Sequence, residues 1–222
     1  MTDNKRKQVF NYRQTAAASV LSSLIVFASM NNAQGRDHLY GMLDNSDLND
    51  CENLYWSGQL FESDNCYRRL TTSTYPPEIR AEAFWALDDL QAANTQFQTA
   101  DSASPENAMI KIRWGELYIQ TYQYGEAYNL FAEALQIEPD NAWAHTGAAM
   151  ALVEGGDPEQ LNMHIGTVMG DALNPPGARL RTMLLVLRGA MERDQFEKAD
   201  EALAEARDLA CCISFSSGTT RR

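Results

Sequence analysis

The sequence predicts an all-α protein, a right-handed superhelical solenoid built from antiparallel helix pairs. Three observations support this fold class. Five residues, in the order Ala, Phe, Ala, Pro and Asn, recur after 34 positions. The spacing of the first three, four residues and then three, places their side chains on one helix face. Strands are not expected, because no stretch alternates apolar and polar residues with β-branched enrichment. One helix pair cannot bury its apolar face alone, but stacked pairs can.

The recurring positions define the repeat unit. They are Ala93 and Ala127, Phe97 and Phe131, Ala100 and Ala134, Pro105 and Pro139, and Asn107 and Asn141. Each proline follows a predicted helix and stops it, since proline lacks the backbone N–H. The same four-then-three spacing returns at Ala199, Leu203 and Ala206. We therefore expect units at residues 74–107, 108–141, 142–175 and 176–209, the last one shifted by about four residues.

Residues 1–35 have the layout of an export segment. Four basic residues precede an uncharged, mostly apolar run at residues 15–30, and Ala33-Gln34-Gly35 supplies small residues before Arg36. This order is typical of a secretory signal peptide, and a run of this length is short for a membrane span. We expect export across a membrane, with the segment either cleaved as a signal peptide or kept as a membrane anchor.

The remainder of the chain is acidic. The whole sequence carries a net charge of −12, and residues 1–35 contribute four basic residues and one acidic residue, which leaves −15 for the rest. Such a charge disfavours binding to nucleic acid. In the N-terminal helical segment at residues 36–73, Cys51 and Cys66 are 15 positions apart and suit a disulfide in an oxidising compartment. Two buried thiols on neighbouring helices are the alternative.

No arrangement of residues in the sequence predicts catalysis, a cofactor or a metal ion. Neither a phosphate-binding glycine loop nor a nucleophile motif occurs. His145 and His164 could meet across a helix pair, but two imidazoles without a third ligand seldom form a closed zinc site. We expect ordinary histidines and no enzymatic activity.

The repeat resembles the tetratricopeptide repeat family. In residues 108–141 the positions that the family fills are held by Trp114, Gly115, Tyr118, Ala127, Phe131, Ala134 and Pro139. In residues 74–107 they are held by Ala81, Phe84, Ala93, Phe97, Ala100 and Pro105. A half-repeat is expected before them, with Gly58, Phe61, Ser63, Tyr67 and Leu70 in pairing positions.

The resemblance implies a binding groove lined by the first helix of each pair. The lining would comprise Trp85, Met109, Ile112, Glu116, Gln120, Trp143, Thr146, Met150, Arg181 and Arg188. The four apolar members in the second and third units would form an adaptable stripe. The alternative is that some of them pack between units. The two arginines lie seven residues apart, on one helix face, and could receive a carboxylate.

The resemblance also implies the class of function. We expect a scaffold, periplasmic or membrane-anchored and facing the periplasm, that binds a protein or peptide partner during assembly of envelope, secretion or pilus machinery. The alternative is a regulatory or substrate-presenting module of an enzyme whose catalytic domain lies elsewhere. Contact with a membrane is expected only through an uncleaved N-terminal segment. The last helix is expected to end near Ala210, before a disordered tail at residues 210–222, which would leave an uncapped repeat for self-association.

Overall fold

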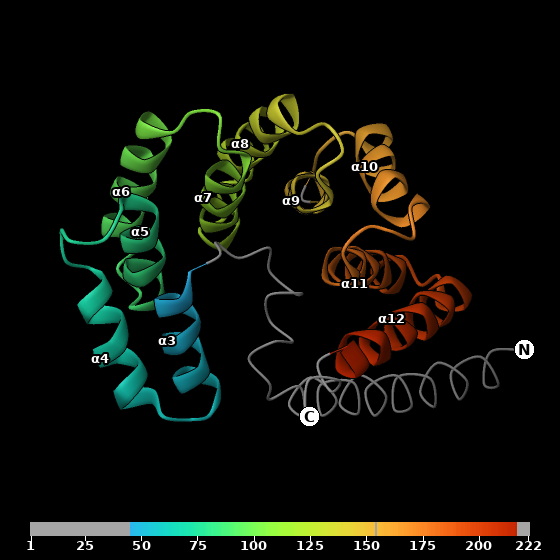
Figure 1. Ribbon diagram of the computed structural model, residues 1–222. Helices are drawn as coiled ribbons and strands as arrows, with labels where there is room; N and C mark the ends of the chain where they lie inside the picture. Colours follow the sequence, from blue (N-terminus) through green and yellow to red (C-terminus); the bar gives the residue numbers. More distant parts are fainter. Residues whose placement is uncertain (1–44, 154, 217–222) are drawn as a thin grey trace, which may run out of the picture. The chain divides into compact units, whose positions relative to one another are not determined.

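The computed structural model describes residues 45–153 and 155–216, and these residues form helices and turns without strands. The predicted all-α solenoid is confirmed. The described residues make five helix pairs (Figure 1): α3 (Ser46–Trp56) with α4 (Leu60–Leu70), α5 (Pro77–Ala86) with α6 (Leu90–Ala103), α7 (Ala108–Gln120) with α8 (Tyr124–Ile137), α9 (Ala142–Leu152) with α10 (Pro158–Gly170), and α11 (Pro176–Glu192) with α12 (Phe196–Ser216). The expected export segment, residues 1–35, lies outside the described residues.

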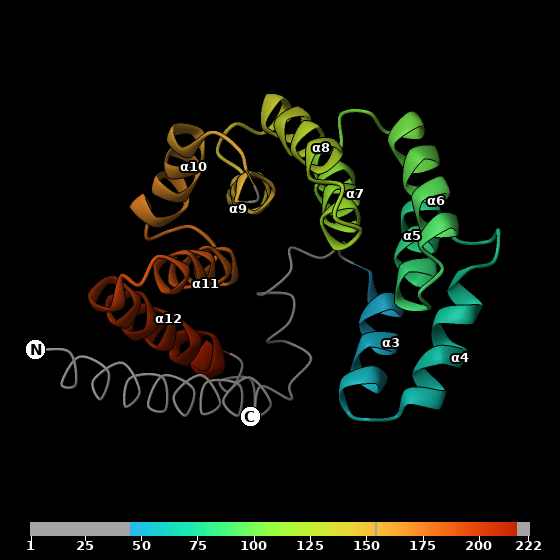
Figure 2. The ribbon, with the colours of Figure 1, turned by 180° about the vertical axis from the view of Figure 1, so that it is seen from behind.

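Each pair packs on the next pair in chain order. Within this helical unit, the odd-numbered helices lie on the inner side of the stack and the even-numbered helices on the outer side, as the front and back views show (Figures 1 and 2). Inner helices of different pairs contact one another, since α9 packs against both α7 and α11. Side chains on the inner helices can therefore meet although they are far apart in the sequence.

The repeated asparagine starts the first helix of a unit. The side-chain oxygen of Asn107 accepts a hydrogen bond from the backbone N–H of Met109 (3.1 Å), and Asn141 accepts from Trp143 (3.0 Å) and Ala144 (3.1 Å). These bonds satisfy N–H groups that have no partner within the helix. The 34-residue recurrence of asparagine is therefore a recurrence of helix N-caps.

The turn inside four of the described pairs also repeats. Three residues connect the two helices, and the middle residue has a positive φ: Gly58 (79°), Asp88 (62°), Tyr122 (60°) and Asp194 (56°). In each turn the next residue donates its N–H to a carbonyl five positions earlier, at 2.9 Å, as in Gln123 to Tyr118. This is the Schellman closure that ends a helix and reverses the chain.

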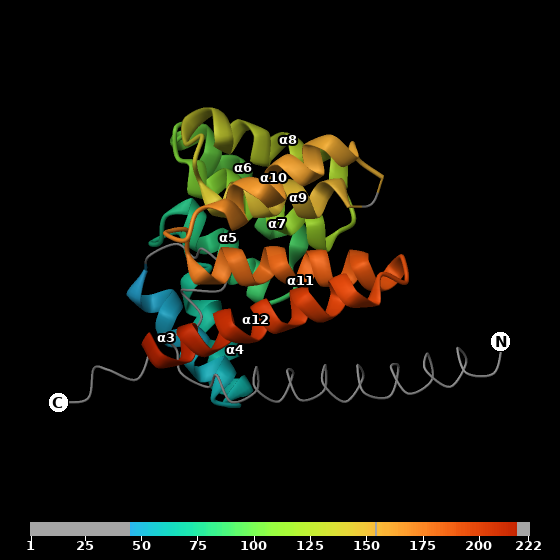
Figure 3. The ribbon, with the colours of Figure 1, turned by 90° about the vertical axis from the view of Figure 1, so that its right-hand side faces the viewer.

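The fourth predicted unit is shifted because its first helix is longer. Helix α11 has 17 residues and α7 has 13, and each is followed by a three-residue turn. The four extra residues make about one helical turn. They displace Ala199, Leu203 and Ala206 by four positions and leave the buried face of α12 intact. Figure 3 shows α11 and α12 running side by side.

Two expectations about the chain's ends need correction. The segment expected to hold a half-repeat contains a complete helix pair, α3 and α4, although Phe61 is exposed and not packed. The last helix does not end near Ala210 but continues to Ser216, because no glycine or proline interrupts residues 196–217. The exposed positions of α12 from residue 197 to 208 are mainly charged, as suits a solvent-facing helix surface. Residues 217–222 lie outside the described part.

A single aromatic ring joins adjacent units at the centre of the stack. Phe131 on α8 is fully buried, and its ring fills the space between Gly115 on α7 and Gly147 on α9. A Cβ atom at Gly147 would lie 2.2 Å from Cε1 of Phe131, and one at Gly115 would lie 2.8 Å from Cζ. Both glycines are required because the ring and the helix backbones are in direct contact.

We expect Gly147→Ala to lower the free energy of unfolding by about 1–3 kcal/mol, because the added methyl group overpacks the site. Gly166→Ala is the matched control, since Gly166 lies within α10 and a Cβ there would have no neighbour within 4 Å. That substitution should stabilise the protein by up to about 1 kcal/mol, the difference in helix propensity. Urea unfolding would measure both, and a shift of the same sign for the two variants would contradict the proposed packing.

Candidate binding pocket

The inner side of the helical unit holds a pocket with a cavity volume of about 430 Å³. Helices α3, α4, α5, α7 and α11 contribute to its wall. The lining combines aromatic rings with charged groups: Glu52, Tyr55, Trp56, Tyr67, Trp85, Ala86, Arg113, Glu116, Ile119, Gln120 and Arg181. Four of the five described helix pairs thus supply residues to one concave surface.

Arg113 on α7 is the central charged group of the pocket wall. It is buried, and it forms a bidentate ion pair with Glu82 on α5, at 2.6 Å from Nε to Oε1 and 2.8 Å from Nη2 to Oε2. Its Nη1 also donates to Glu116, and its guanidinium carbon lies 4.7 Å from the centre of the Trp85 ring. Burial favours the neutral form, but the charges of Glu82 and Glu116 prevail and raise the pKa of Arg113 above its ordinary value.

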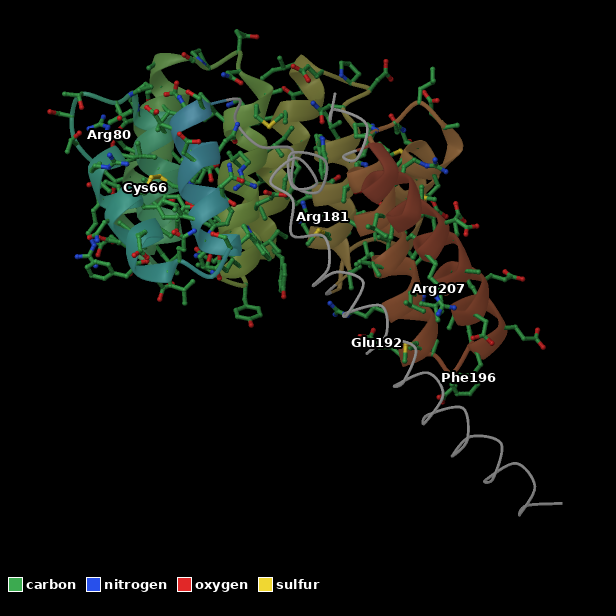
Figure 4. All side chains as sticks on the ribbon, turned by 60° about the horizontal axis from the view of Figure 1, so that its bottom comes forward. Cys66, Arg80, Arg181, Glu192, Phe196 and Arg207 are labelled. Atoms are coloured by element: carbon green, nitrogen blue, oxygen red, sulfur yellow. A yellow bond between two sulfur atoms is a disulfide. The ribbon has the colours of Figure 1, made fainter. Side chains whose placement is uncertain are left out.

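Glu116 extends this network to the fifth helix pair. Its second oxygen accepts a hydrogen bond from Nη1 of Arg181 on α11 at 2.5 Å, and Nη2 of Arg181 approaches the sulfur of Met150 on α9 at 3.4 Å. Figure 4 labels Arg181 beside the inner helices. A chain of alternating charges, Glu82, Arg113, Glu116 and Arg181, therefore joins α5, α7 and α11. It fixes the backbone that forms the pocket floor.

Aromatic residues form the rim of the pocket. The indole N–H of Trp85 donates to the side-chain oxygen of Gln120 on α7. Tyr55 and Trp56 pack edge to face with ring centres 5.4 Å apart, and they remain 49% and 45% exposed. Glu52 accepts hydrogen bonds from Trp56 Nε1 (3.2 Å) and from the hydroxyl of Tyr67 (2.9 Å). The rim therefore offers ordered aromatic surface that is open to solvent.

A disulfide between Cys51 and Cys66 joins the two helices that carry most of this rim. The sulfur atoms are 2.04 Å apart and the Cα atoms 5.3 Å apart. Cys51 is on α3, immediately before Glu52, and Cys66 is on α4, immediately before Tyr67. The bridge thus ties the backbone of α3 to that of α4 at the level of the Glu52–Tyr67 hydrogen bond.

The structure brings together part of the groove expected from the sequence. Trp85, Glu116, Gln120 and Arg181 all line the pocket, and Met150 contacts Arg181 beside it. These five residues lie on four different inner helices. The carboxylate that pairs with Arg181 belongs to the same chain, because Glu116 accepts its hydrogen bond.

The groove assignment is wrong for three of the expected residues. Ile112 and Thr146 are fully buried, and Trp143 is 8% exposed. Ile112 and Trp143 belong to the core between units, whereas the Thr146 hydroxyl bonds to that of Thr182 on α11 at 3.0 Å. The cause is the composition of α9, whose many alanines and one glycine let α7, α8, α10 and α11 pack closely around it. The alternative, packing between units, holds for Ile112 and Trp143.

Two further expected residues lie away from the pocket. Met109 is half-buried against the central core. Arg188 is exposed and pairs with Glu192 on the same helix at 2.9 Å, and Figure 4 shows Glu192 toward the far end of α11 from Arg181. The two arginines share a helix face, as their spacing predicted, but their carboxylate partners belong to this chain.

Sequence reasoning missed seven residues of the pocket wall, including the apolar Ala86 and Ile119. Glu52, Tyr55, Trp56 and Tyr67 were missed because α3 and α4 were expected to form only half a repeat. Arg113 was missed because its neighbours in α7 gave no sign of its distant partner, Glu82 on α5. A useful signal was present: the three-residue separation of Arg113 and Glu116 already places an opposite charge beside the arginine on one helix.

His145 and His164 do meet, as the sequence suggested, but as a hydrogen-bonded pair. Their Nδ1 atoms are 2.7 Å apart, and Nε2 of His145 lies 2.9 Å from the carbonyl oxygen of Pro139. His145 therefore donates from Nε2 and accepts at Nδ1, and His164 donates from Nδ1. Nε2 of His164 is buried without a hydrogen-bond partner, which suits its unprotonated form. Burial and the neighbouring His145 lower the pKa of His164 to about 4.

We expect this pair to make stability depend on pH. Above about pH 6.5 His164 is neutral in both the folded and the unfolded chain. Between that value and about 4 the unfolded chain binds a proton that the folded chain excludes, so the free energy of unfolding falls as the pH falls. His164→Gln, which keeps a donor for His145, should give a shallower fall in thermal midpoint from about pH 7 to about pH 4.5. Parallel curves for the two proteins would contradict this origin.

The described residues hold neither a metal-binding cluster nor a helix that could span a membrane. No group of three or more His, Cys, Asp or Glu side chains lies close enough together to hold a metal ion in residues 45–153 and 155–216. Within the same ranges, none of the helices has the length and apolar character needed to cross a membrane.

The helix pairs, their 34-residue period and the ring-against-glycine packing define a class of repeat protein. Residues 120–160 match the family model described as tetratricopeptide repeat. The matched stretch, which includes helices α8 and α9, is a tetratricopeptide repeat. Its fold is similar to that of MamA, residues 41 to the end, from Desulfovibrio magneticus RS-1, with 17% identity and a TM-score of 0.53 over 75% of this chain and 97% of that one.

A second solved structure, the MamA RS-1 ArsTM double mutant, is similar to the same extent. It has 16% identity and a TM-score of 0.53 over 75% of this chain and 96% of that one. No curated protein matches the sequence. At this level of identity the likeness concerns the fold, so the function of this chain has to be argued from its own pocket.

Proposed function

We propose that this protein is an interaction scaffold that binds a protein or peptide partner in the pocket on its inner side. The observation that carries the proposal is the pocket's construction: a solvent-exposed aromatic rim stands on a buried network of ion pairs that joins three inner helices. Aromatic residues are enriched where proteins bind one another, because they bury large areas at small entropic cost. Stacked helical repeats commonly use such concave surfaces for binding.

The proposed setting is outside the cytoplasm, either periplasmic or attached to a membrane and facing the periplasm. Two observations support it: the basic and then apolar layout of residues 1–35, and the Cys51–Cys66 disulfide, which is of a kind that persists in oxidising compartments. In this setting the scaffold would serve the assembly of envelope, secretion or pilus machinery. The partner would be one component of such an assembly.

Site-specific photocrosslinking in cells tests where the partner binds. A photoreactive phenylalanine analogue at Gln120, on the pocket rim, should give a discrete protein adduct. The same group at Leu173, which is 92% exposed in the turn before α11 and outside the pocket, should not. Adducts of equal yield at both positions, or none at Gln120, would argue against partner binding in the pocket.

A further inference from the structure

The charges that line the inner pocket balance within its wall. Two carboxylates and two guanidinium groups contribute to the lining, those of Glu52, Glu116, Arg113 and Arg181. Glu116 accepts hydrogen bonds from both arginines, and Arg113 also pairs with Glu82. Glu52 accepts hydrogen bonds from two rim side chains. A charged group that entered the pocket would therefore have to compete with a bond that the wall already makes, and a displaced buried charge is costly.

The polar atoms of the aromatic rim are engaged in the same way. The indole N–H of Trp85 donates to the side chain of Gln120, and that of Trp56 donates to Glu52. In the part of the chain that the structure describes, the buried side-chain atoms without a hydrogen-bond partner all lie outside the pocket lining, on Arg80, Gln96, His164 and Arg179. The wall thus presents no buried polar atom that a ligand would have to satisfy.

The solvent-exposed surface of the pocket is mainly apolar. Tyr55 and Trp56 are 49% and 45% exposed, Ala86 is exposed, and Trp85 and Ile119 are partly exposed. The cavity volume of about 430 Å³ lies in the range of pockets that bind compact apolar groups, about 300–1,000 Å³. Burial of apolar surface is therefore the main contribution that this pocket can make to binding.

We propose that the partner enters this pocket with an uncharged segment, anchored by a large apolar side chain that packs against the rings of Tyr55, Trp56 and Trp85. This inference rests on the proposed function and names the chemistry of the partner segment. Selectivity comes from exclusion, because a charge that loses water and gains no partner is costly. The net charge of −15 beyond residue 35 attracts cations at long range, but the carboxylates of the pocket wall are already bonded.

Titration of the full chain with three short capped peptides tests the proposal. The peptides differ in one side chain between alanines: phenylalanine, its para-aminomethyl derivative, which is a cation, and its para-carboxy derivative, which is an anion. By calorimetry, we expect the phenylalanine peptide to bind at least about tenfold more tightly than either charged peptide. Its affinity should not fall as the salt concentration rises, since no ion pair forms, and its binding should have a negative heat-capacity change.

A charge placed in the wall assigns the effect to the pocket. Ala86 is the last residue of α5, is exposed and lines the cavity, so Ala86→Glu adds a carboxylate there without disturbing the core. This variant should bind the phenylalanine peptide more weakly and the cationic peptide more tightly than the wild type does. Leu173→Glu is the matched control, on an exposed turn outside the pocket, and should change neither affinity. The thermal midpoint would verify that both variants are folded.

The inference is overturned if either charged peptide binds as tightly as the phenylalanine peptide, or if the phenylalanine peptide does not bind at about 1 mM. It is also overturned if Ala86→Glu leaves both affinities unchanged. These outcomes are distinct from failure of the scaffold proposal. A partner crosslinked at Gln120 through a charged segment would refute the chemistry assigned to the partner and leave the pocket as its binding site.

Discussion

Trp143→Ala should lower the free energy of unfolding by about 3–5 kcal/mol, the range found when a large aromatic side chain is deleted from a core. Trp143 on α9 is 8% exposed and belongs to the cluster that contains Ile112 and Phe131. Its removal would leave a cavity between two helix pairs that the surrounding helices can only partly fill. Urea unfolding monitored by circular dichroism would measure the loss.

Trp56→Ala is the control for this prediction. Trp56 is 45% exposed at the pocket rim, so its truncation should change stability by no more than about 0.5 kcal/mol. Equal unfolding midpoints for the two tryptophan variants would contradict the burial of Trp143. Such a result would restore the groove position that the repeat pattern first suggested for this residue.

Arg113→Met should be similarly destabilising, by about 3–5 kcal/mol, for an electrostatic reason. The substitution leaves the buried carboxylates of Glu82 and Glu116 without their shared cation, and an uncompensated buried charge is costly. Arg113→Lys should lose less, because it keeps the charge but not the bidentate geometry. Chemical unfolding of both variants beside the wild type would give the two values.

Arg188→Met is the matched control for the arginine series. Arg188 pairs with Glu192 on the surface of α11, where both side chains are more than half exposed, so its loss should cost about 0–1 kcal/mol. If Arg113→Met proved no more costly than Arg188→Met, the ion-pair network would not be what holds the pocket floor. Combining Arg113→Met with Glu82→Gln should recover part of the lost stability, because one unpaired charge is then removed.

The repeat architecture could be predicted from the sequence because its determinants are local. The spacing of Ala127, Phe131 and Ala134 predicts one face of a helix. The end of that helix is predicted by Pro139, and the start of the next one by the N-cap Asn141. The greater length of α11 could also be seen in the sequence, because it displaces Ala199 by four positions from the repeat pattern. These features depend on neighbours within one unit or the next.

The pocket could be predicted only in part because its determinants are not local. The pairing of Glu116 with Arg181 spans 65 residues and depends on how closely successive inner helices approach one another. That approach depends on the alanine-rich α9, which also buries Trp143 and Thr146 instead of presenting them to a ligand. A repeat pattern predicts the same exposure for equivalent positions in every unit. In α9 the small side chains let neighbouring helices approach closely, so Trp143 and Thr146 are buried where the pattern predicted exposure.

The first helix pair, α3 and α4, was also predicted only in part. Ser63, Tyr67 and Leu70 on α4 have the same four-then-three spacing as the later repeats and are all buried. The turn of this pair lies 30 residues before the turn of the next pair, since Gly58 precedes Asp88 by 30, whereas Asp88 precedes Tyr122 by 34. The 34-residue period therefore predicted only half of this helix pair. The rim residues of the pocket that lie on α3 and α4 were missed for the same reason.

The central claim is that the protein binds its partner through the inner pocket. The most direct test is to measure how tightly a variant of the pocket rim binds that partner. Once crosslinking has identified the partner, its affinity should be measured for the full chain carrying Trp56→Ala and for Leu173→Ala, with the melting midpoint of each. We expect Trp56→Ala to lower affinity about thirtyfold or more at an unchanged midpoint, as for an aromatic residue that anchors an interface, and Leu173→Ala to bind like the wild type. Full affinity of a folded Trp56→Ala protein would contradict the claim.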